Sequence, residues 1–303
     1  MATVDQAAGH GLVTVDADNV DLIVKPTTAQ EVEMYQRTLR DPRLSVLRAT
    51  APQYFGSEAL PSALGKMTHS IRLTNVVRTV QQRIHVAHAT STTSIMDIKL
   101  GRVRHGPNTP ADRVTHIMEK DRGTTSEVGA LRITGAVHQR TMPGQPHEII
   151  TWREGKLLGR TITMPQIHDV LRLFCSLEES PAGLSSLALS DEASRILTAS
   201  GGFFPPNCDA DVSRAYKRRL LDLLGQLDDA QVFEKYSFVS SSLLLCHAAR
   251  FDITGRNWES CVDVKMIDFS QSGLVGDEAF PDTIVGFREG LLNLIATFDA
   301  ITK

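Results

Sequence analysis

Residues 93–101 (Thr-Ser-Ile-Met-Asp-Ile-Lys-Leu-Gly) combine the groups in this sequence that are best suited to chemistry. Asp97 and Lys99 are two residues apart, so in a strand both would point to the same face of the sheet. Gly101 would let the backbone turn close to a ligand. A cation beside a carboxylate suits phosphoryl transfer, because Lys99 can contact the moving group while Asp97 orients or deprotonates a hydroxyl. The simpler interpretation is an exposed salt pair.

The periodicity of the sequence predicts the elements that would hold this pair. Apolar and polar residues alternate from Val262 to Met266, which predicts a half-buried strand with Asp268 at its end. A polar start with Glu31 in the first turn predicts a helix over residues 28–39. The other expected elements are two strands within 12–24, a helix over about 111–120, a strand over 131–137, helices over 212–227 and 287–301, and surface loops at 143–148 and 178–181.

Composition limits the class of protein. The chain has 303 residues, 42% of them apolar and 22% charged, which is typical of a globular protein with one large domain or two lobes. The net charge of −3 means that a phosphate-rich ligand needs a local cluster of cations, and nucleic-acid binding is not expected. No apolar run approaches the ~20 residues of a membrane span. The four cysteines lack metal-ligand spacing, so we expect reduced thiols and a cytoplasmic or nuclear location.

Several short segments resemble motifs of the inositol polyphosphate kinase family. Residues 93–101 are similar to its PxxxDxKxG signature, 240–245 to its SSLL motif and 264–270 to its VKMIDFA segment. Further similarities are Lys25-Pro26 with 31–35 to the KP and ExxFY pair, 51–56 to a P-x-Y-x-G turn, 156–160 to KxxGR, and 286–295 to a closing GYxxGLxNLI helix. They follow the family's order from about Leu22 to Ile295, which chance does not explain.

The resemblance implies an α+β fold of two lobes, distantly like that of protein kinases. Residues 1–77 would form a small lobe with an antiparallel sheet and helix that bind ATP. Residues 78–303 would form a larger mixed lobe with the catalytic signature and the segment that binds inositol phosphate. The sequence shows neither an HRD-type catalytic loop nor a GxGxxG loop, so a protein kinase proper is not expected.

The resemblance also implies roles for single residues. Lys25 would contact the ATP phosphates, with Glu31 holding it in place as in the Lys–Glu pair of protein kinases. Asp268 would bind Mg²⁺, which favours one or two carboxylates together with phosphate oxygens. Ser242 is carried over as a site residue for the cofactor. Lys99 is the first choice for contacting both the transferred group and the acceptor, and Asp97 is either the general base, which we favour, or a contact to the ATP ribose.

The substrate side needs a basic cluster. In the family, the helical segment after the signature contacts inositol phosphates, and here this region contains Arg104, Arg113 and Lys120. Arg113 and Lys120 are seven residues apart, so two helical turns place them on one face. Lys156 and Arg160 form a second candidate pair. Each cation alone is typical of a solvated surface, but together they are the best candidates for an anion pocket.

Three departures from the family pattern bear on the ligands. The proline of the signature is Thr93 here, which removes a rigid turn but no reactive group. The acidic hinge residue is replaced at Thr74-Asn75, so Leu73 and Asn75 are the candidate contacts to adenine or ribose. The histidine that commonly follows the DFA segment is Gln271, a candidate substrate contact that can donate a hydrogen bond but carries no charge.

The choice of substrate is open among branches of the family. Arg104-His-Gly106, Thr124-Thr-Ser126 and 131–135 resemble the inositol hexakisphosphate kinase branch, which makes inositol pyrophosphates, while 97–101 resembles the multikinase branch. We therefore rank hexakisphosphate kinase first, multikinase second and inositol trisphosphate 3-kinase third. A binding pseudokinase or scaffold is the alternative from another class, and retention of Lys25, Asp97, Lys99 and Asp268 argues against it. The oligomeric state is not indicated.

Overall fold

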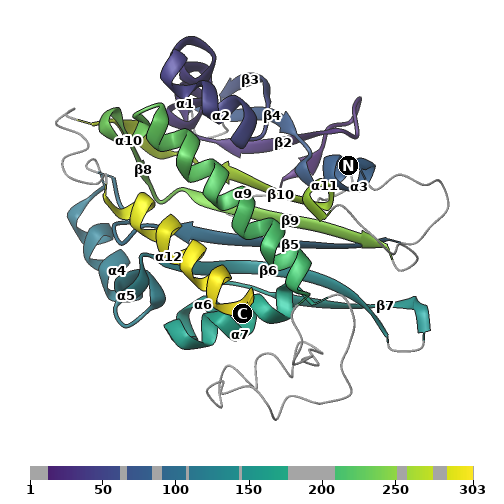
Figure 1. Cartoon of the computed structure of the whole chain (residues 1–303). Helices are drawn as coiled ribbons and strands as arrows, with labels where there is room; N and C mark the ends of the chain where they lie inside the picture. Colours follow the sequence, from purple (N-terminus) through teal and green to yellow (C-terminus); the bar gives the residue numbers. More distant parts are fainter. Residues whose placement is uncertain are drawn as a thin grey trace.

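Antiparallel sheets organise the protein, as the computed structural model shows for residues 13–61, 67–83, 91–106, 109–142, 145–176, 209–250, 258–275 and 285–302 (Figure 1). Within these ranges a four-stranded sheet comes from the first part of the chain, and a five-stranded and a two-stranded sheet come from the rest. Helices pack against each of these sheets (Figure 1). The predicted α+β class with antiparallel sheets is confirmed.

The small lobe contains the four-stranded sheet in the order β1-β2-β4-β3. Its elements are β1 (Thr14–Val15), β2 (Leu22–Thr27), α1 (Ala29–Arg40), η1 (Pro42–Leu44), α2 (Ser45–Thr50), β3 (Tyr54–Pro61) and β4 (Met67–Thr74). The helix α1 begins where the sequence predicts it, because the Thr28 hydroxyl accepts a hydrogen bond of 3.2 Å from the Glu31 N–H. Glu31 is thereby fixed in the first turn, next to the end of β2.

The large lobe is built on the five-stranded sheet, in the order β10-β9-β5-β6-β7. Its strands are β5 (Ser91–Leu100), β6 (Leu131–Met142), β7 (Gln145–Glu154), β9 (Ser242–Arg250) and β10 (Val262–Ile267), while β8 (Tyr236–Val239) and β11 (Gln271–Leu274) form the two-stranded sheet. The signature strand β5 is central, so its side chains lie between those of β6 and β9. This position buries Asp97 and brings it beside residues of both neighbours.

Helices α9 (Ala210–Asp229) and α12 (Val285–Thr302) lie side by side across the large sheet (Figure 1). Both match helices expected from apolar stripes, and stripe residues such as Leu220, Leu223, Leu291 and Leu294 are buried in the main core. Within the described residues, the other helices of this lobe are α3 (Val76–Arg83), α4 (Ala111–Asp121), α5 (Thr125–Gly129), α6 (Leu158–Thr161), α7 (Met164–Phe174), α10 (Val232–Lys235) and α11 (Trp258–Cys261). The core thus fixes the sheet in which β5 ends near Lys99 and β10 ends just before Asp268.

Local expectations differ from the structure in two places. The proposed lobe boundary after residue 77 falls inside α3, which packs against β5, β9 and β10 of the large sheet. The loop expected at 143–148 is wrong for residues 145–148, because β7 already begins at Gln145 and pairs antiparallel with β6, while residues 143–144 lie outside the described residues. Cross-strand pairing overrode the turn propensity of this segment. The loop expected at 178–181 lies outside the described residues.

Three of the four cysteines lie in the described residues. Cys175, Cys246 and Cys261 are free thiols and buried, and Cys208 lies outside the described residues. Among the described helices, none combines the length and the apolar character that a membrane crossing requires.

Candidate active site

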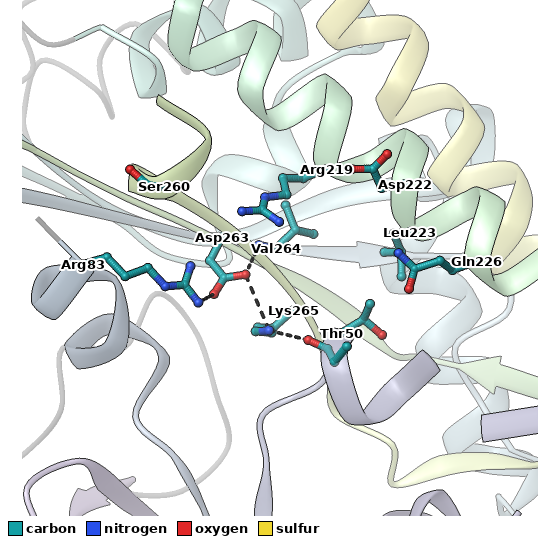
Figure 2. Close-up of a pocket in the computed structure, with 11 residues that line it drawn as sticks. Thr50, Arg83, Arg219, Asp222, Leu223, Gln226, Ser260, Asp263, Val264 and Lys265 are labelled. Carbon is teal, nitrogen blue, oxygen red and sulfur yellow. Dashed lines mark hydrogen bonds and ion pairs between the residues drawn. The ribbon is translucent and has the colours of Figure 1, made fainter. Parts of the chain in front are cut away.

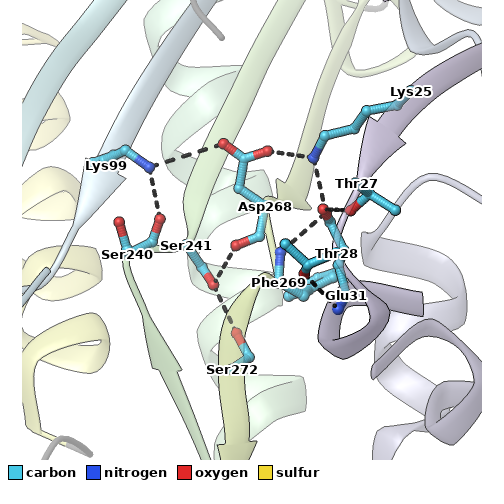
Figure 3. A network of polar contacts seen from close by, with 10 residues as sticks. All are labelled: Lys25, Thr27, Thr28, Glu31, Lys99, Ser240, Ser241, Asp268, Phe269 and Ser272. Carbon is cyan, nitrogen blue, oxygen red and sulfur yellow. Dashed lines mark hydrogen bonds and ion pairs between the residues drawn. The ribbon is translucent and has the colours of Figure 1, made fainter. Parts of the chain in front are cut away.

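Three strand ends and one helix bring the predicted phosphate and metal residues together (Figure 3). Lys25 of β2 donates to Glu31 Oε1 at 2.8 Å and to Asp268 Oδ1 at 2.6 Å. Asp268 lies between β10 and β11, and its other oxygen, Oδ2, is 3.9 Å from Lys99 Nζ. We call Lys25, Glu31, Asp97, Lys99 and Asp268 the carboxylate–lysine centre.

Glu31 holds Lys25 from a buried position. Its side chain is 2% exposed, Oε1 also accepts the Phe269 N–H at 3.2 Å, and Oε2 accepts the Thr27 hydroxyl. Burial lowers the pKa of Lys25, but the Asp268 and Glu31 carboxylates outweigh burial, so the pKa is raised above the ordinary lysine value. Lys25 is therefore a fixed cation at neutral pH.

The backbone at Asp268 is held in an unusual conformation. Its φ is +65°, in the left-handed region that non-glycine residues rarely adopt. The Ser241 hydroxyl donates to the Asp268 carbonyl at 3.1 Å and lies 3.0 Å from the Ser272 hydroxyl, which fixes the turn (Figure 3). Ser240, with φ of +59°, presents its carbonyl to Lys99 Nζ at 2.7 Å. Backbone strain of this kind persists where the surrounding structure enforces it, often at functional sites.

Asp97 is buried as well, with an exposed fraction of 3% and no hydrogen-bond partner for Oδ1. Burial, followed by the charge of Asp268, raises its pKa, while Lys99 and the hydroxyls of Thr134 and Ser242 lower it. Ser242 is the register partner of Lys99 on β9, which places it on the face of Asp97. A carboxylate with a raised pKa and a free oxygen can accept a proton, so this environment suits a general base.

A group of cations lies next to the centre. Arg132 is the register partner of Lys99 on β6, and Gly159 of α6 packs against the Arg132 side chain. Burial, then Lys99 and Arg160, lower the pKa of Lys156, so these charges are close to one another. Burial, then Arg132 and Arg160, lower the pKa of Arg104 to about 9, and burial, then Arg160, lower that of Arg132 to about 10. We call Arg104, Arg132, Lys156 and Arg160 the basic cluster.

Arg132 was missed by sequence reasoning as a site residue. It stands in the segment 131–135, whose resemblance to the hexakisphosphate kinase branch indicates no contact for the arginine. Pairing it with Lys99 requires the register of β5 and β6, including the bulge between Asp97 and Ile98. The sequence signal available was an arginine inside an otherwise apolar strand, since buried arginines normally have an anionic partner.

Arg113 and Lys120 lie apart from these contacts. Both are exposed on α4, as the predicted helix face allows, but within the described residues no contact links either one to the basic cluster. The C-terminal residue of α4, Asp121, makes that link by ion pairs to Arg104 and Arg132. A role of Arg113 and Lys120 in substrate binding stays a prediction.

The two expected adenine contacts have structural partners. The Leu73 side chain is buried in the main core, and its strand β4 is paired on both sides. Asn75 accepts from the Arg78 N–H at 3.2 Å and donates to the Val20 carbonyl at 3.3 Å, so it caps α3 and ties it to the small lobe. These side chains are thus used by the fold, and their contact with a nucleotide stays a prediction.

Gln271 lies close to the loop that follows β5. A Cβ at Gly106 would overlap with the Gln271 Oε1 atom, so the two residues are in close contact. This contact brings residues 101–106 to the turn that carries Asp268. Gly101 has a φ of +98° and packs against Gly286 at the start of α12. The turn at Gly101 therefore brings the backbone close to α12.

A polar groove of about 460 Å³ lies beside β10 (Figure 2). Its buried carboxylate, Asp263, pairs with Arg83 at 3.1 Å and with Lys265 at 3.6 Å. Lys265 also donates to the Ala49 carbonyl at 2.5 Å. These contacts connect α2 and α3 to the strand that ends before Asp268, so we assign the groove to the contact between the lobes.

The donor set at the centre fits a divalent cation such as Mg²⁺. Asp97 and Asp268 are close enough for the charge of one to raise the pKa of the other, and Asp97 Oδ1 has no hydrogen-bond partner. Mg²⁺ favours one or two carboxylates with phosphate oxygens and water. Among the described residues no group of three or more His, Cys, Asp or Glu side chains could hold a metal by protein ligands alone. Phosphate oxygens and water would supply the other ligands of a metal held by these carboxylates.

Comparison with known proteins agrees with this geometry. The inositol polyphosphate kinase family matches residues 84–299. The inositol polyphosphate multikinase of Schizosaccharomyces pombe is 28% identical over 183 residues, covering 57% of this chain, and the match spans 64% of that relative's length.

Two solved structures share the fold. The inositol phosphate multikinase of S. cerevisiae, in complex with ADP and Mn²⁺, matches with a TM-score of 0.59 and 20% identity over 93% of this chain and 99% of that one. A second inositol phosphate multikinase structure matches with a TM-score of 0.55 and 20% identity, over 89% and 99%. At 20% identity, these TM-scores show a common fold and nothing beyond it.

Proposed function

The chain belongs to the inositol polyphosphate kinase family, and we propose that it transfers the γ-phosphoryl group of ATP, with Mg²⁺, to a hydroxyl of an inositol polyphosphate. The observation that carries this proposal is the ion-pair chain from Lys25 through Asp268 to Lys99, beside the buried Asp97 and the basic cluster. A binding scaffold needs the cations but has no need of paired carboxylates at their centre.

Each residue of the centre has a task in the reaction. Lys25, held by Glu31, binds the phosphates of ATP. Lys99 contacts the phosphoryl group in transit, because it lies between Asp268 and the basic cluster. Mg²⁺, when bound at Asp268, supplies positive charge that offsets the negative charge of the transferring group.

Bond changes follow from this arrangement. The acceptor oxygen of the inositol forms a bond to the γ-phosphorus as the bond from that phosphorus to the leaving ADP oxygen breaks. The proton of the hydroxyl passes to a carboxylate oxygen of Asp97, whose raised pKa favours acceptance. Contact with the ATP ribose remains the alternative role of Asp97. Since the transition state is loose, positioning and electrostatics contribute most of the rate.

We propose the multikinase activity rather than that of a hexakisphosphate kinase. The segments 104–106, 124–126 and 131–135 favoured a hexakisphosphate kinase. The relatives found by sequence and by structure are multikinases, which supports the multikinase hypothesis instead. The expected acceptors are inositol phosphates that still carry a free hydroxyl. The basic cluster would hold their phosphates.

The test is incubation of the purified protein with Mg²⁺-ATP and a panel of inositol tris-, tetrakis-, pentakis- and hexakisphosphates, with the products resolved by chromatography. We expect products from acceptors with free hydroxyls and none from the hexakisphosphate. A pyrophosphate product from the hexakisphosphate would restore the first-ranked reading. Binding of inositol phosphates without consumption of ATP would instead identify a pseudokinase scaffold.

A further inference from the structure

One carboxylate lies inside the basic cluster. Asp121, the last residue of α4, is buried and accepts the Nε and Nη2 groups of Arg104 and the Nη1 group of Arg132, the latter at 2.8 Å. Arg104 is in the loop after β5, and Arg132 is on β6. A single acidic group therefore joins three segments next to the centre.

The position of Asp121 is unfavourable for the helix that carries it. The C-terminal end of a helix has a partial negative charge, so an acidic residue there is disfavoured by the helix dipole. Arg104 and Arg132 compensate for this, because their side chains are 14% and 5% exposed and both donate to Asp121. The placement is thus explained by the arginines and not by the stability of α4.

The arginines need an anion whether or not a substrate is present. Burial, followed by the charges of neighbouring arginines, disfavours the charged forms of Arg104 and Arg132, as their lowered pKa values indicate. Asp121 supplies one negative charge to them permanently. A phosphate of the substrate would compete with Asp121 for the same N–H groups and would be repelled by its charge.

We propose that Asp121 is a specificity-determining and positioning residue: it orients Arg104 and Arg132 and, by neutralising part of the basic cluster, disfavours the most highly phosphorylated inositols. The number of phosphates that a cluster accepts depends on its net charge as well as on its shape. This rests on the proposed function, and it names the subset of inositol phosphates that the same site selects.

The charge and the orientation can be separated by two variants. Asp121→Asn keeps the shape and one acceptor oxygen but removes the charge, whereas Asp121→Ala removes both. Asp121→Glu keeps the charge and serves as the conservative variant. Asp263→Asn is the matched control, because Asp263 is also a buried carboxylate that joins two cations, Arg83 and Lys265, but faces the groove of Figure 2.

The experiment measures the Kd of inositol hexakisphosphate and of an inositol trisphosphate by calorimetry, with kcat and KM for the trisphosphate. Asp121→Asn should bind the hexakisphosphate about tenfold more tightly, the scale of one added charge contact, with a smaller gain for the trisphosphate and a steeper dependence on salt. Asp121→Ala should raise KM for the trisphosphate. Asp121→Glu and Asp263→Asn should keep the wild-type ratio of the two Kd values.

An unchanged ratio of the two Kd values in Asp121→Asn would overturn the proposal. If that variant does not fold, the same ratio measured for Asp121→Ser, a further neutral and polar substitution, decides the question. The binding arm also separates the two hypotheses. Wild-type protein that binds inositol phosphates without turnover contradicts the proposed activity, while a shifted ratio in the neutral variants would still support the role of Asp121. Wild-type protein that binds none of them would overturn both.

Discussion

The Nζ atom of Lys25 and the Oδ1 atom of Asp268 lie 2.6 Å apart, although the residues are separated by 243 positions in the sequence. The contact joins the second strand of the small lobe to the turn after β10 in the large lobe. Because Lys25 also pairs with Glu31, and Asp268 also lies near Lys99, this one ion pair connects the predicted ATP-binding groups with the predicted phosphoryl-transfer groups.

Asp268→Asn should abolish turnover and leave the protein folded. The amide keeps the size of the side chain but loses the negative charge that would bind Mg²⁺ and that pairs with Lys25. The measurement is kcat with Mg²⁺-ATP, together with thermal unfolding to verify the fold. Near-normal activity of this variant with Mg²⁺ would show that Asp268 does not bind the metal.

Lys99→Ala should cost at least ~3 kcal/mol of transition-state stabilisation, on the scale of losing one preorganised contact to developing charge. The loss should be mainly in kcat, because Lys99 lies between Asp268 and Arg132 rather than at the edge of the site. Steady-state kinetics with both substrates is the measurement. A variant with normal kcat and a raised KM would show that Lys99 only binds the ground state.

Ser242→Ala should move the acid limb of the kcat/KM profile to higher pH. The Ser242 hydroxyl lowers the pKa of Asp97, against the larger effects of burial and Asp268 that raise it. A base must be unprotonated, so activity is present above the folded-state pKa of Asp97 and is lost as the pH falls through it. Removing the hydroxyl raises this pKa further.

Two variants complete this pH test. Ser213→Ala removes a buried hydroxyl on α9 that bonds to the Ala210 carbonyl, and it should leave the acid limb in place. Asp97→Asn should abolish the limb together with most of the rate. If Asp97→Asn instead keeps the limb and raises KM for ATP, the residue is the ribose contact.

Arg132→Gln should raise KM for the inositol phosphate without much change in KM for ATP. Arg132 is buried beside Lys99, whereas Arg113 and Lys120 are exposed on α4. The double variant Arg113→Gln and Lys120→Gln should therefore have a smaller effect, which high salt diminishes because exposed charges are screened over roughly 10 Å at 0.1 M. An equal or larger effect of the double variant would show that the main substrate contacts lie on α4.

Gly159→Ala should destabilise the protein by about 3 kcal/mol, because its Cβ would overlap with the Ile133 carbonyl on β6. It should also raise KM for the inositol phosphate, since moving α6 moves Arg160. Gly225→Ala is the control: a Cβ there meets no other atom, and alanine favours the helix α9 by about 0.5–1 kcal/mol. Chemical denaturation measures the change in the free energy of unfolding of each variant, and steady-state kinetics measures the KM of Gly159→Ala.

Residues near one another in the chain were placed correctly by local rules. The two-residue period of a strand put Asp97 and Lys99 on one face, and the polar start of a helix put Glu31 in the first turn of α1. The helical stripe that contains Leu220 and Leu223 became α9, packed on the core. These features follow from covalent geometry and from the burial of apolar side chains, which a sequence displays directly.

The site as a whole was decided by sheet order and register. The pairing of β5 with β6 and β9 brings Arg132 and Ser242 to Lys99, and no spacing in the sequence contains that information. The same applies to Asp121, whose ion pairs join a helix end to a strand and a loop. The sequence alone determined the family resemblance and the chemical groups available. The tertiary structure determined which groups meet, because contacts between distant segments depend on how whole elements pack.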